Sequence, residues 1–181
     1  TSANHRRTRA IQTGGPFSML TTQRLVLRAA ISNDLNDLFA VFSNAQAMRY
    51  WSTPPHPNPD VTKGNLDRMI ANSKSALTYF VIEYRGRVIG CAGMHSHNEV
   101  GFILHPDYWR KGIIREAMTR IIPYLFDTTG VSQLTADADP RNIASVKCLK
   151  YLGFVVTGTA KDTYCIEGKW SDSIYLARQR P

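Results

Sequence analysis

The chain has 181 residues, 43% of them hydrophobic, and carries 22 basic and 14 acidic side chains for a formal net charge of +8. This length and composition fit one globular domain with a buried core and exclude a disordered chain. No apolar run approaches the roughly 20 residues that cross a bilayer, so we expect no membrane span. The positive charge suits a polyanionic ligand such as a nucleotide cofactor, whereas no basic helix or aromatic RNA-binding signature points to a nucleic acid.

The polar, acid-free residues 1–18 are expected to form a flexible tail or a cloning remnant, and residues 19–181 a single domain. The first strand is predicted over residues 23–30 from its alternating leucines. A capped helix follows with apolar positions at residues 35, 38, 39 and 42, and residues 44–51 are expected to form a short helical turn. The proline-rich residues 54–59 predict a stiff loop, after which a second helix starts near Asp60.

Two β-rich runs, residues 78–84 and 87–94, predict a hairpin around Arg85-Gly86. A further strand is expected at 98–104, a helix at 113–126 that contains Pro123, and a strand at 133–138. A helix over 142–152 ends before Gly153. The last two strands, 154–159 and 170–177, are predicted to be joined by a polar loop. Mixed hairpins and crossover helices indicate an α+β or mixed α/β class.

Residues 105–118 place a basic, glycine-bearing turn between an apolar strand and a helix. The first N–H groups of a helix have no partner within it, and the helix dipole favours negative charge there. Gly112 lets the backbone approach a ligand closely. We interpret the turn as a pyrophosphate site, although the same pattern also occurs in plain connections with solvated charges.

Three stretches resemble the GNAT N-acetyltransferase superfamily, and in particular its RimJ/RimL-like branch of ribosomal-protein serine/alanine N-acetyltransferases. Residues 100–112 resemble the strand and pyrophosphate turn of the family. Residues 142–145 with Leu152-Gly153-Phe154 are similar to its N-x-x-S…LGF pattern, and residues 22–28 to T-x-R-L-x-L-R. The resemblance implies an acyl-CoA N-acyltransferase fold, α/β (α+β), with a mixed, mostly antiparallel sheet of about seven strands and about four flanking helices.

The resemblance also implies acetyl-CoA as co-substrate and no metal. Backbone groups of Phe102, Ile103 and Leu104 would pair with the pantetheine arm. The turn would hold the pyrophosphate through residues Trp109, Arg110, Lys111, Gly112, Ile113, Ile114 and Arg115, with charge from Lys111 and Arg115. The sequence departs from the family at two positions. Ile114 occupies a position where the family has Gly or Ala, and Leu149 occupies one where many members have a tyrosine that acts as general acid.

For catalysis, the resemblance implies that Ser145 gives a proton to the departing thiolate and that Asn142 bonds the cofactor arm, unless Asn142 only caps its helix. Glu99 is the candidate general base, or else a solvated strand end. Trp51 would border the acceptor, or else anchor the core. His95 and His97 are expected to alternate onto one strand face. A metal pair is not favoured, since no third ligand is evident, which leaves a proton relay with Glu99 or turn residues without a role.

The predicted function is direct transfer of acetyl from acetyl-CoA to a primary amine in a ternary complex. The acceptor is a small-molecule amine or a protein N-terminus. The alternatives are a noncatalytic acyl-CoA-binding module and a nucleic-acid binder. Cys91, Cys148 and Cys165 have no CxxC spacing, which argues against disulfides and zinc and favours a cytoplasmic protein. A monomer or a homodimer is expected.

Overall fold

The computed structural model describes residues 19–181, and the tail expected over residues 1–18 lies outside the described residues. The strands are β1 (Leu20–Thr21), β2 (Leu25–Arg28), β3 (Tyr79–Tyr84), β4 (Arg87–Ser96), β5 (Glu99–Leu104), β6 (Gln133–Ala138), β7 (Val155–Ile166) and β8 (Lys169–Gln179). The helices are α1 (Leu35–Phe42), α2 (Pro59–Ser73), α3 (Ile113–Thr129) and α4 (Ile143–Tyr151), with short 3₁₀ turns η1 (Ser32–Asp34) and η2 (Pro106–Tyr108).

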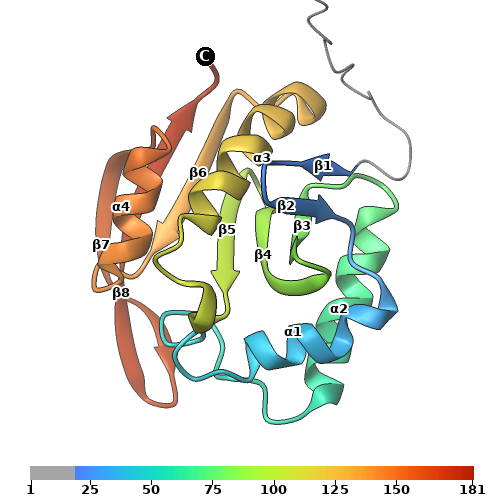
Figure 1. Ribbon diagram of the computed structural model, residues 1–181. Coiled ribbons are helices and arrows are strands. Elements are labelled where there is room, and N and C mark those ends of the chain that lie inside the picture. Colours follow the sequence, from blue (N-terminus) through green and yellow to red (C-terminus); the bar gives the residue numbers. More distant parts are fainter. Residues whose placement is uncertain (1–18) are drawn as a thin grey trace, which may run out of the picture.

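The strands form one sheet in the order β1-β2-β3-β4-β5-β6-β8-β7 (Figure 1). Among the strands of residues 19–181, only β5 and β6 pair in parallel; the other neighbours are antiparallel. The expected mixed, mostly antiparallel sheet with four helices is therefore confirmed, with eight strands instead of about seven. Among the described residues, no helix has the length and apolar character of a membrane span.

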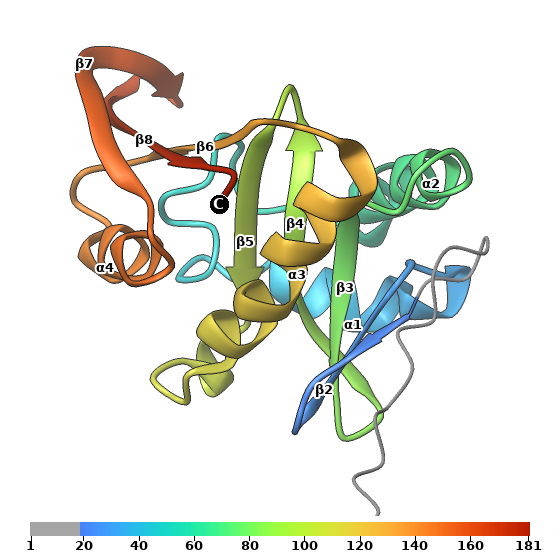
Figure 2. The same cartoon turned by 90° about the horizontal axis from the view of Figure 1, so that it is seen from above.

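Each face of the sheet buries its own hydrophobic core, as the alternation of side chains along a strand requires. In β3, Phe80 and Ile82 join the core under α3 and α4, whereas Val81 joins the core under α1 and α2. The two helix pairs accordingly lie on opposite faces (Figure 2). Pro123 lies inside α3, which continues to Thr129 beyond its expected end.

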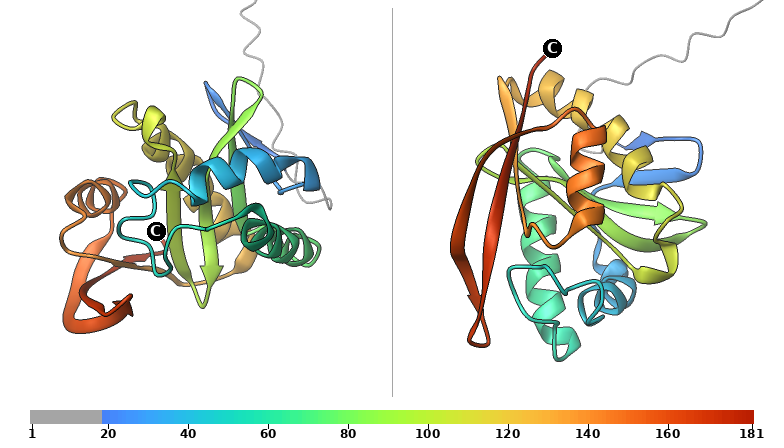
Figure 3. Two further views of the ribbon diagram at one scale, coloured as in Figure 1. Left: turned by 90° about the horizontal axis from the view of Figure 1, so that it is seen from below. Right: turned by 90° about the vertical axis from the view of Figure 1, so that its left-hand side faces the viewer.

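One local expectation was wrong, and one short strand was missed. Residues 160–169, expected as a polar loop, extend β7 and β8 into a long hairpin that projects beyond the body (Figure 3). The short helical turn expected over residues 44–51 is present: the Met48 N–H donates to the Asn44 carbonyl at 3.0 Å, and Asn44 Oδ1 accepts from the Gln46 and Ala47 N–H groups. The strand β1 was not anticipated, because two residues are too short to display a period.

The sheet opens between β5 and β6. Their one register pair is Glu99 with Thr135, and beyond it the two strands diverge towards their carboxyl ends. On its other edge, β5 pairs with β4 along its length. Within the described sheet, the β6-facing backbone of residues 100–104 is therefore left without a strand partner, which is the position where an extended ligand can add as a strand.

Candidate active site

The turn after β5 brings backbone N–H groups together at the start of α3. Gly112 is the residue before the helix and has φ of 71°, and Arg110 has φ of 60°. No side chain of residues 19–181 caps this helix, whereas Asn58 caps α2 and Asn142 caps α4. The free N–H groups and the helix dipole make the start of α3 suitable for an anion.

The turn is fastened to the first strands by a network that sequence reasoning did not assign. Glu116 accepts hydrogen bonds from the Thr22 hydroxyl (2.5 Å) and from the Arg24 N–H (2.9 Å) and Nε (2.6 Å). Arg24 Nη2 also donates to the Lys111 carbonyl at 2.9 Å. Partial burial opposes ionisation of Glu116, but the bonds from Thr22 and Arg24 hold its pKa below the ordinary value. Thr22 and Arg24 of the T-x-R-L-x-L-R stretch thus hold the turn in place.

The basic side chains of the turn point in different directions. Lys111 Nζ donates to the Asp107 carbonyl at 2.7 Å and lies over the Tyr108 ring, so its side chain is not brought into a cavity. Arg115 lies 3.3 Å from the centroid of the Tyr151 ring. Arg110 and Arg115 both border a cavity of about 660 Å³ in the opening between β5 and β6.

This smaller cavity collects nearly all the residues expected to bind the cofactor. Its lining includes Phe102, Ile103, Leu104, Trp109, Arg110, Gly112, Ile113, Ile114, Arg115 and Asn142, and Lys111 is the exception. The Trp109 indole donates to the Leu104 carbonyl at 2.8 Å and so ties the turn to the end of β5. Ile114 is half-buried and packs against the core, while also bordering the cavity.

The start of α4 supplies the candidate hydroxyl. Asn142 Oδ1 accepts from the Ser145 N–H at 3.2 Å, which is a helix cap, and both residues border the smaller cavity. Leu149 is buried in the core at 2% exposure. Tyr151 is 63% exposed, lies under the Arg115 guanidinium and borders neither cavity, so it does not take the place of a tyrosine acid.

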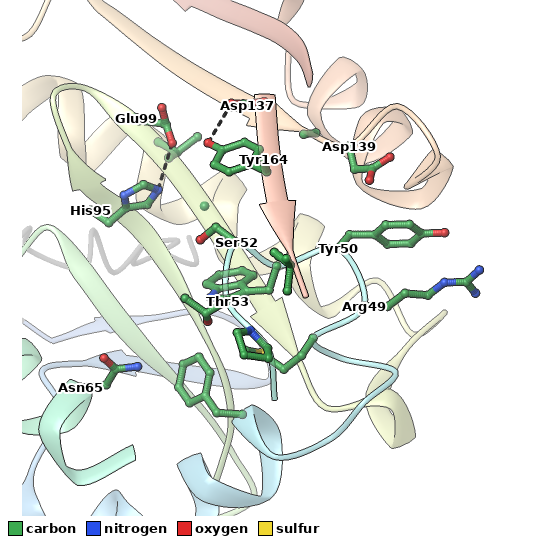
Figure 4. Close-up of a pocket in the computed structure, with 18 of the residues that line it drawn as sticks. Arg49, Tyr50, Ser52, Thr53, Asn65, His95, Glu99, Asp137, Asp139 and Tyr164 are labelled. Atoms are coloured by element: carbon green, nitrogen blue, oxygen red, sulfur yellow. Dashed lines mark hydrogen bonds and ion pairs between the residues drawn. The ribbon is translucent and has the colours of Figure 1, made fainter. Parts of the chain in front are cut away.

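A larger cavity of about 870 Å³ adjoins the smaller one and contains Trp51 and Glu99. Trp51 both borders this cavity and packs edge-on against Phe42 in the core under α1 and α2. His95 Nε2 lies 3.5 Å from Glu99 Oε1 (Figure 4). The expectation that His97 shares the strand face of His95 was wrong, because His97 lies in the β4–β5 turn with φ of 38°.

The two cavities meet along three segments. Residues that border both come from 49–51, 100–101 and 137–141, the last at the end of β6 and before α4. Sequence reasoning missed Asp137 there, as it missed Tyr164 of β7, whose hydroxyl donates to Asp137 Oδ2 at 3.1 Å (Figure 4). Burial, followed by the nearby Asp137 carboxylate, raises the pKa of Tyr164 to about 12, so the phenol stays protonated at neutral pH.

The one sequence signal for this junction was an acidic residue inside a predicted strand. In contrast to Asp137, Asp139 is paired: Arg141 Nη2 lies 2.6 Å from its Oδ2, and the same guanidinium donates to Ser171 at 2.9 Å. Among the described residues, no three His, Cys, Asp or Glu side chains gather as a metal site would require. The two adjoining cavities leave room for two ligands side by side.

A sheet that splays beside an uncapped helix start, with a second cavity joined to the first, defines an acyltransferase-like architecture. The chain belongs to the acetyltransferase (GNAT) domain family, whose model matches residues 24–155. It is an N-acetyltransferase of the GNAT family, as the sequence motifs predicted.

Named relatives match over most of the chain. The [ribosomal protein uS5]-alanine N-acetyltransferase of Escherichia coli is 27% identical over 182 residues, covering 92% of this chain and 93% of its own. The spermidine N(1)-acetyltransferase of the same species is 25% identical over 164 residues, covering 87% of each.

Solved structures share the fold. A GNAT-family acetyltransferase from Bacillus anthracis has a TM-score of 0.80 at 19% identity, covering 90% of this chain and 98% of its own. The microcin C7 self-immunity acetyltransferase, solved in complex with acetyl-CoA and AMP, has a TM-score of 0.77 at 14% identity, covering 87% and 93%.

Proposed function

We propose that the protein transfers the acetyl group of acetyl-CoA directly to a primary amine, with both substrates bound at once. The observation that carries this proposal is the junction of the two cavities, which share residues of three segments. A thioester in the smaller cavity and an amine in the larger one would meet there. Holding two reactants in contact converts an encounter in solution into a step within one complex.

Acetyl-CoA fits the smaller cavity by three features. The edge of β5 at residues 102–104 lacks a strand partner and offers backbone groups to the pantetheine arm, which would add as a strand, although Trp109 already bonds the Leu104 carbonyl. The N–H groups of residues 110–115 would receive the pyrophosphate, since anions bind at uncapped helix starts. The Arg110 and Arg115 side chains border the cavity and add positive charge.

The acetyl transfer needs two proton movements, for which the site has two candidate groups. Glu99 borders the larger cavity and would accept a proton from the acceptor ammonium. The neutral nitrogen then attacks the thioester carbon, the C–S bond breaks, and the nitrogen loses a second proton. Ser145 borders the smaller cavity and would pass one proton to the departing sulfur, recovering it from that nitrogen.

The acceptor is a protein N-terminal amine or a small aliphatic amine. The relatives named above act on ribosomal protein uS5 alanine and on spermidine, and they match this chain with similar identity. Both acceptors present a primary amine that is an ammonium ion at neutral pH, which a carboxylate at the site would suit.

The test is thiol release from acetyl-CoA over a panel containing spermidine, 1,4-diaminobutane and peptides with N-terminal Ala or Ser. We expect at least one amine to release thiol well above the rate of hydrolysis, and the Glu99→Gln variant to lower that rate. If no amine of the panel releases thiol although acetyl-CoA binds, the noncatalytic acyl-CoA-binding module is the better account.

A further inference from the structure

Asp137 is a carboxylate at the junction of the two cavities that the sequence motifs did not indicate. It comes from β6 and borders both cavities. Glu99 of β5 and Tyr164 of β7 line the larger cavity together with Asp137. Its cross-strand neighbour on β8 is Tyr175. The lining of the larger cavity around Asp137 therefore comes from strands on both sides of the opening in the sheet.

Folding leaves the Asp137 carboxylate only half satisfied. Oδ2 accepts one hydrogen bond from the Tyr164 hydroxyl at 3.1 Å. Oδ1 is buried and has no hydrogen-bond partner among residues 19–181. In the same part of the chain, no basic side chain lies within ion-pair distance of Asp137, whereas the nearby Asp139 is held by Arg141 and the buried Asp34 by Arg28.

An unpaired, desolvated carboxylate oxygen costs stability. The chain has a net charge of +8, yet no cation from residues 19–181 pairs with this carboxylate. Folding alone therefore gives no reason for a carboxylate at this position. A ligand that brings a positively charged hydrogen-bond donor gives one. An ammonium group has three N–H donors and one positive charge, and it gains most from a carboxylate that is screened from water.

We propose that Asp137 binds the ammonium form of the acceptor, so that the substrate class is a basic aliphatic amine that arrives as a cation. This inference rests on the proposed acetyl transfer for its functional meaning, but the binding itself does not require turnover. Asp137 receives the cation at the cavity junction, and Tyr164 orients the carboxylate through Oδ2. Glu99, which lines only the larger cavity, remains the proton acceptor.

The test measures binding without chemistry. The full chain is saturated with CoA, which carries no acetyl group, and titrated with 1,4-diaminobutane or its neutral isostere butane-1,4-diol, with affinities read by ligand-observed NMR. Asp137→Asn keeps the shape and removes the charge. Asp127→Asn is the matched control, because Asp127 is exposed on α3 and borders neither cavity.

We expect the wild-type chain to prefer the diamine to the diol, and Asp137→Asn to weaken diamine binding about tenfold to hundredfold, as the loss of one charged hydrogen bond does. Asp127→Asn should bind as the wild type does. Thermal unfolding adds a readout that separates ligand binding from a structural role: Asp137→Asn should unfold at no lower temperature than the wild type, since the orphaned charge is gone.

The proposal is overturned if Asp137→Asn binds the diamine as tightly as the control variant, or if the wild type binds diol and diamine equally. It is also overturned if the variant loses both binding and thermal stability, which marks a structural residue. Diamine binding that depends on Asp137, together with no thiol release from any amine, would uphold this inference while refuting the proposed acetyl transfer.

Discussion

At the scale of single residues, the site combines groups that the sequence indicated with groups that only the fold brings close. Asn142 and Ser145 lie where their motif placed them, one turn apart at the start of α4. Asp137 and Tyr164 are 27 residues apart, and their contact depends on how far the β7–β8 hairpin extends. No local pattern encodes that distance, so this part of the site could not be predicted.

Ser145 is the first residue to test. Ser145→Ala should lower kcat for acetyl transfer about tenfold, because a hydroxyl is a weak acid and its loss removes less than a strong general acid would. Affinity for acetyl-CoA, measured by calorimetry, should not change, since the helix cap uses the backbone of Ser145 and the side chain of Asn142. An unchanged kcat would remove Ser145 from the mechanism.

The stability of the fold is expected to depend on pH through His56, which lies in the proline loop beside the larger cavity. Its ring is 6% exposed, stacks on Phe42, and lies 2.8 Å from the Thr62 hydroxyl and 3.2 Å from the Asn65 amide. Burial lowers the pKa of His56 below its ordinary value of 6.5. The neutral ring is thus favoured in the folded chain, and the stability it contributes is complete above that ordinary value.

This stability is lost as the pH falls below 6.5 towards the folded-state pKa. We expect urea unfolding midpoints of the wild type to drop between about pH 7.5 and about pH 5.5 more than those of His56→Gln, which has no ring to protonate. Equal drops in the two proteins would show that His56 contributes nothing to the acid sensitivity of the fold.

At the scale of elements, strands with a buried face were predicted well and those without one were not. The apolar runs of β3, β4 and β5 and the exact bounds of β6 agree with the sequence pattern. The outer half of the β7–β8 hairpin is largely exposed, so it has no hydrophobic alternation to read. Its turn, Glu167-Gly168 with φ of 50° and 76°, repeats the Arg85-Gly86 turn that did predict a hairpin.

The network between the first strands and α3 predicts a selective effect on the cofactor. Glu116→Gln removes the charge that holds Arg24, whose side chain fixes the Lys111 carbonyl. We expect the KM for acetyl-CoA to rise roughly three- to tenfold, with kcat and the KM for the amine nearly unchanged. Steady-state kinetics with each substrate varied in turn would measure this split.

A matched control for that variant is Asp67→Asn, which breaks the exposed Lys63–Asp67 pair of the same 2.6 Å length on α2. Exposed pairs contribute little, so its kinetics should equal those of the wild type. If Glu116→Gln raised the KM for acetyl-CoA and the KM for the amine together, or only lowered thermal stability, the network would stabilise the whole fold and would have no special effect on the turn.

At the scale of the whole molecule, the resemblance of three short motifs led to the correct family and sheet type. What it could not give is the opening between β5 and β6, since one register pair at Glu99 and Thr135 is a property of the assembled sheet. This opening joins the two cavities and gives β5 its free edge. The proposed acetyl transfer therefore requires acetyl-CoA to bind in the opening between β5 and β6.

Backbone hydrogen exchange with and without CoA tests this claim most directly. We predict that CoA slows exchange above all at the amides of Phe102 and Leu104, which face away from β4, and of residues 112–115, because the first pair with the pantetheine arm and the second receive the pyrophosphate. Strong CoA binding that leaves both segments unprotected, or protects a different part of the chain, would contradict the account.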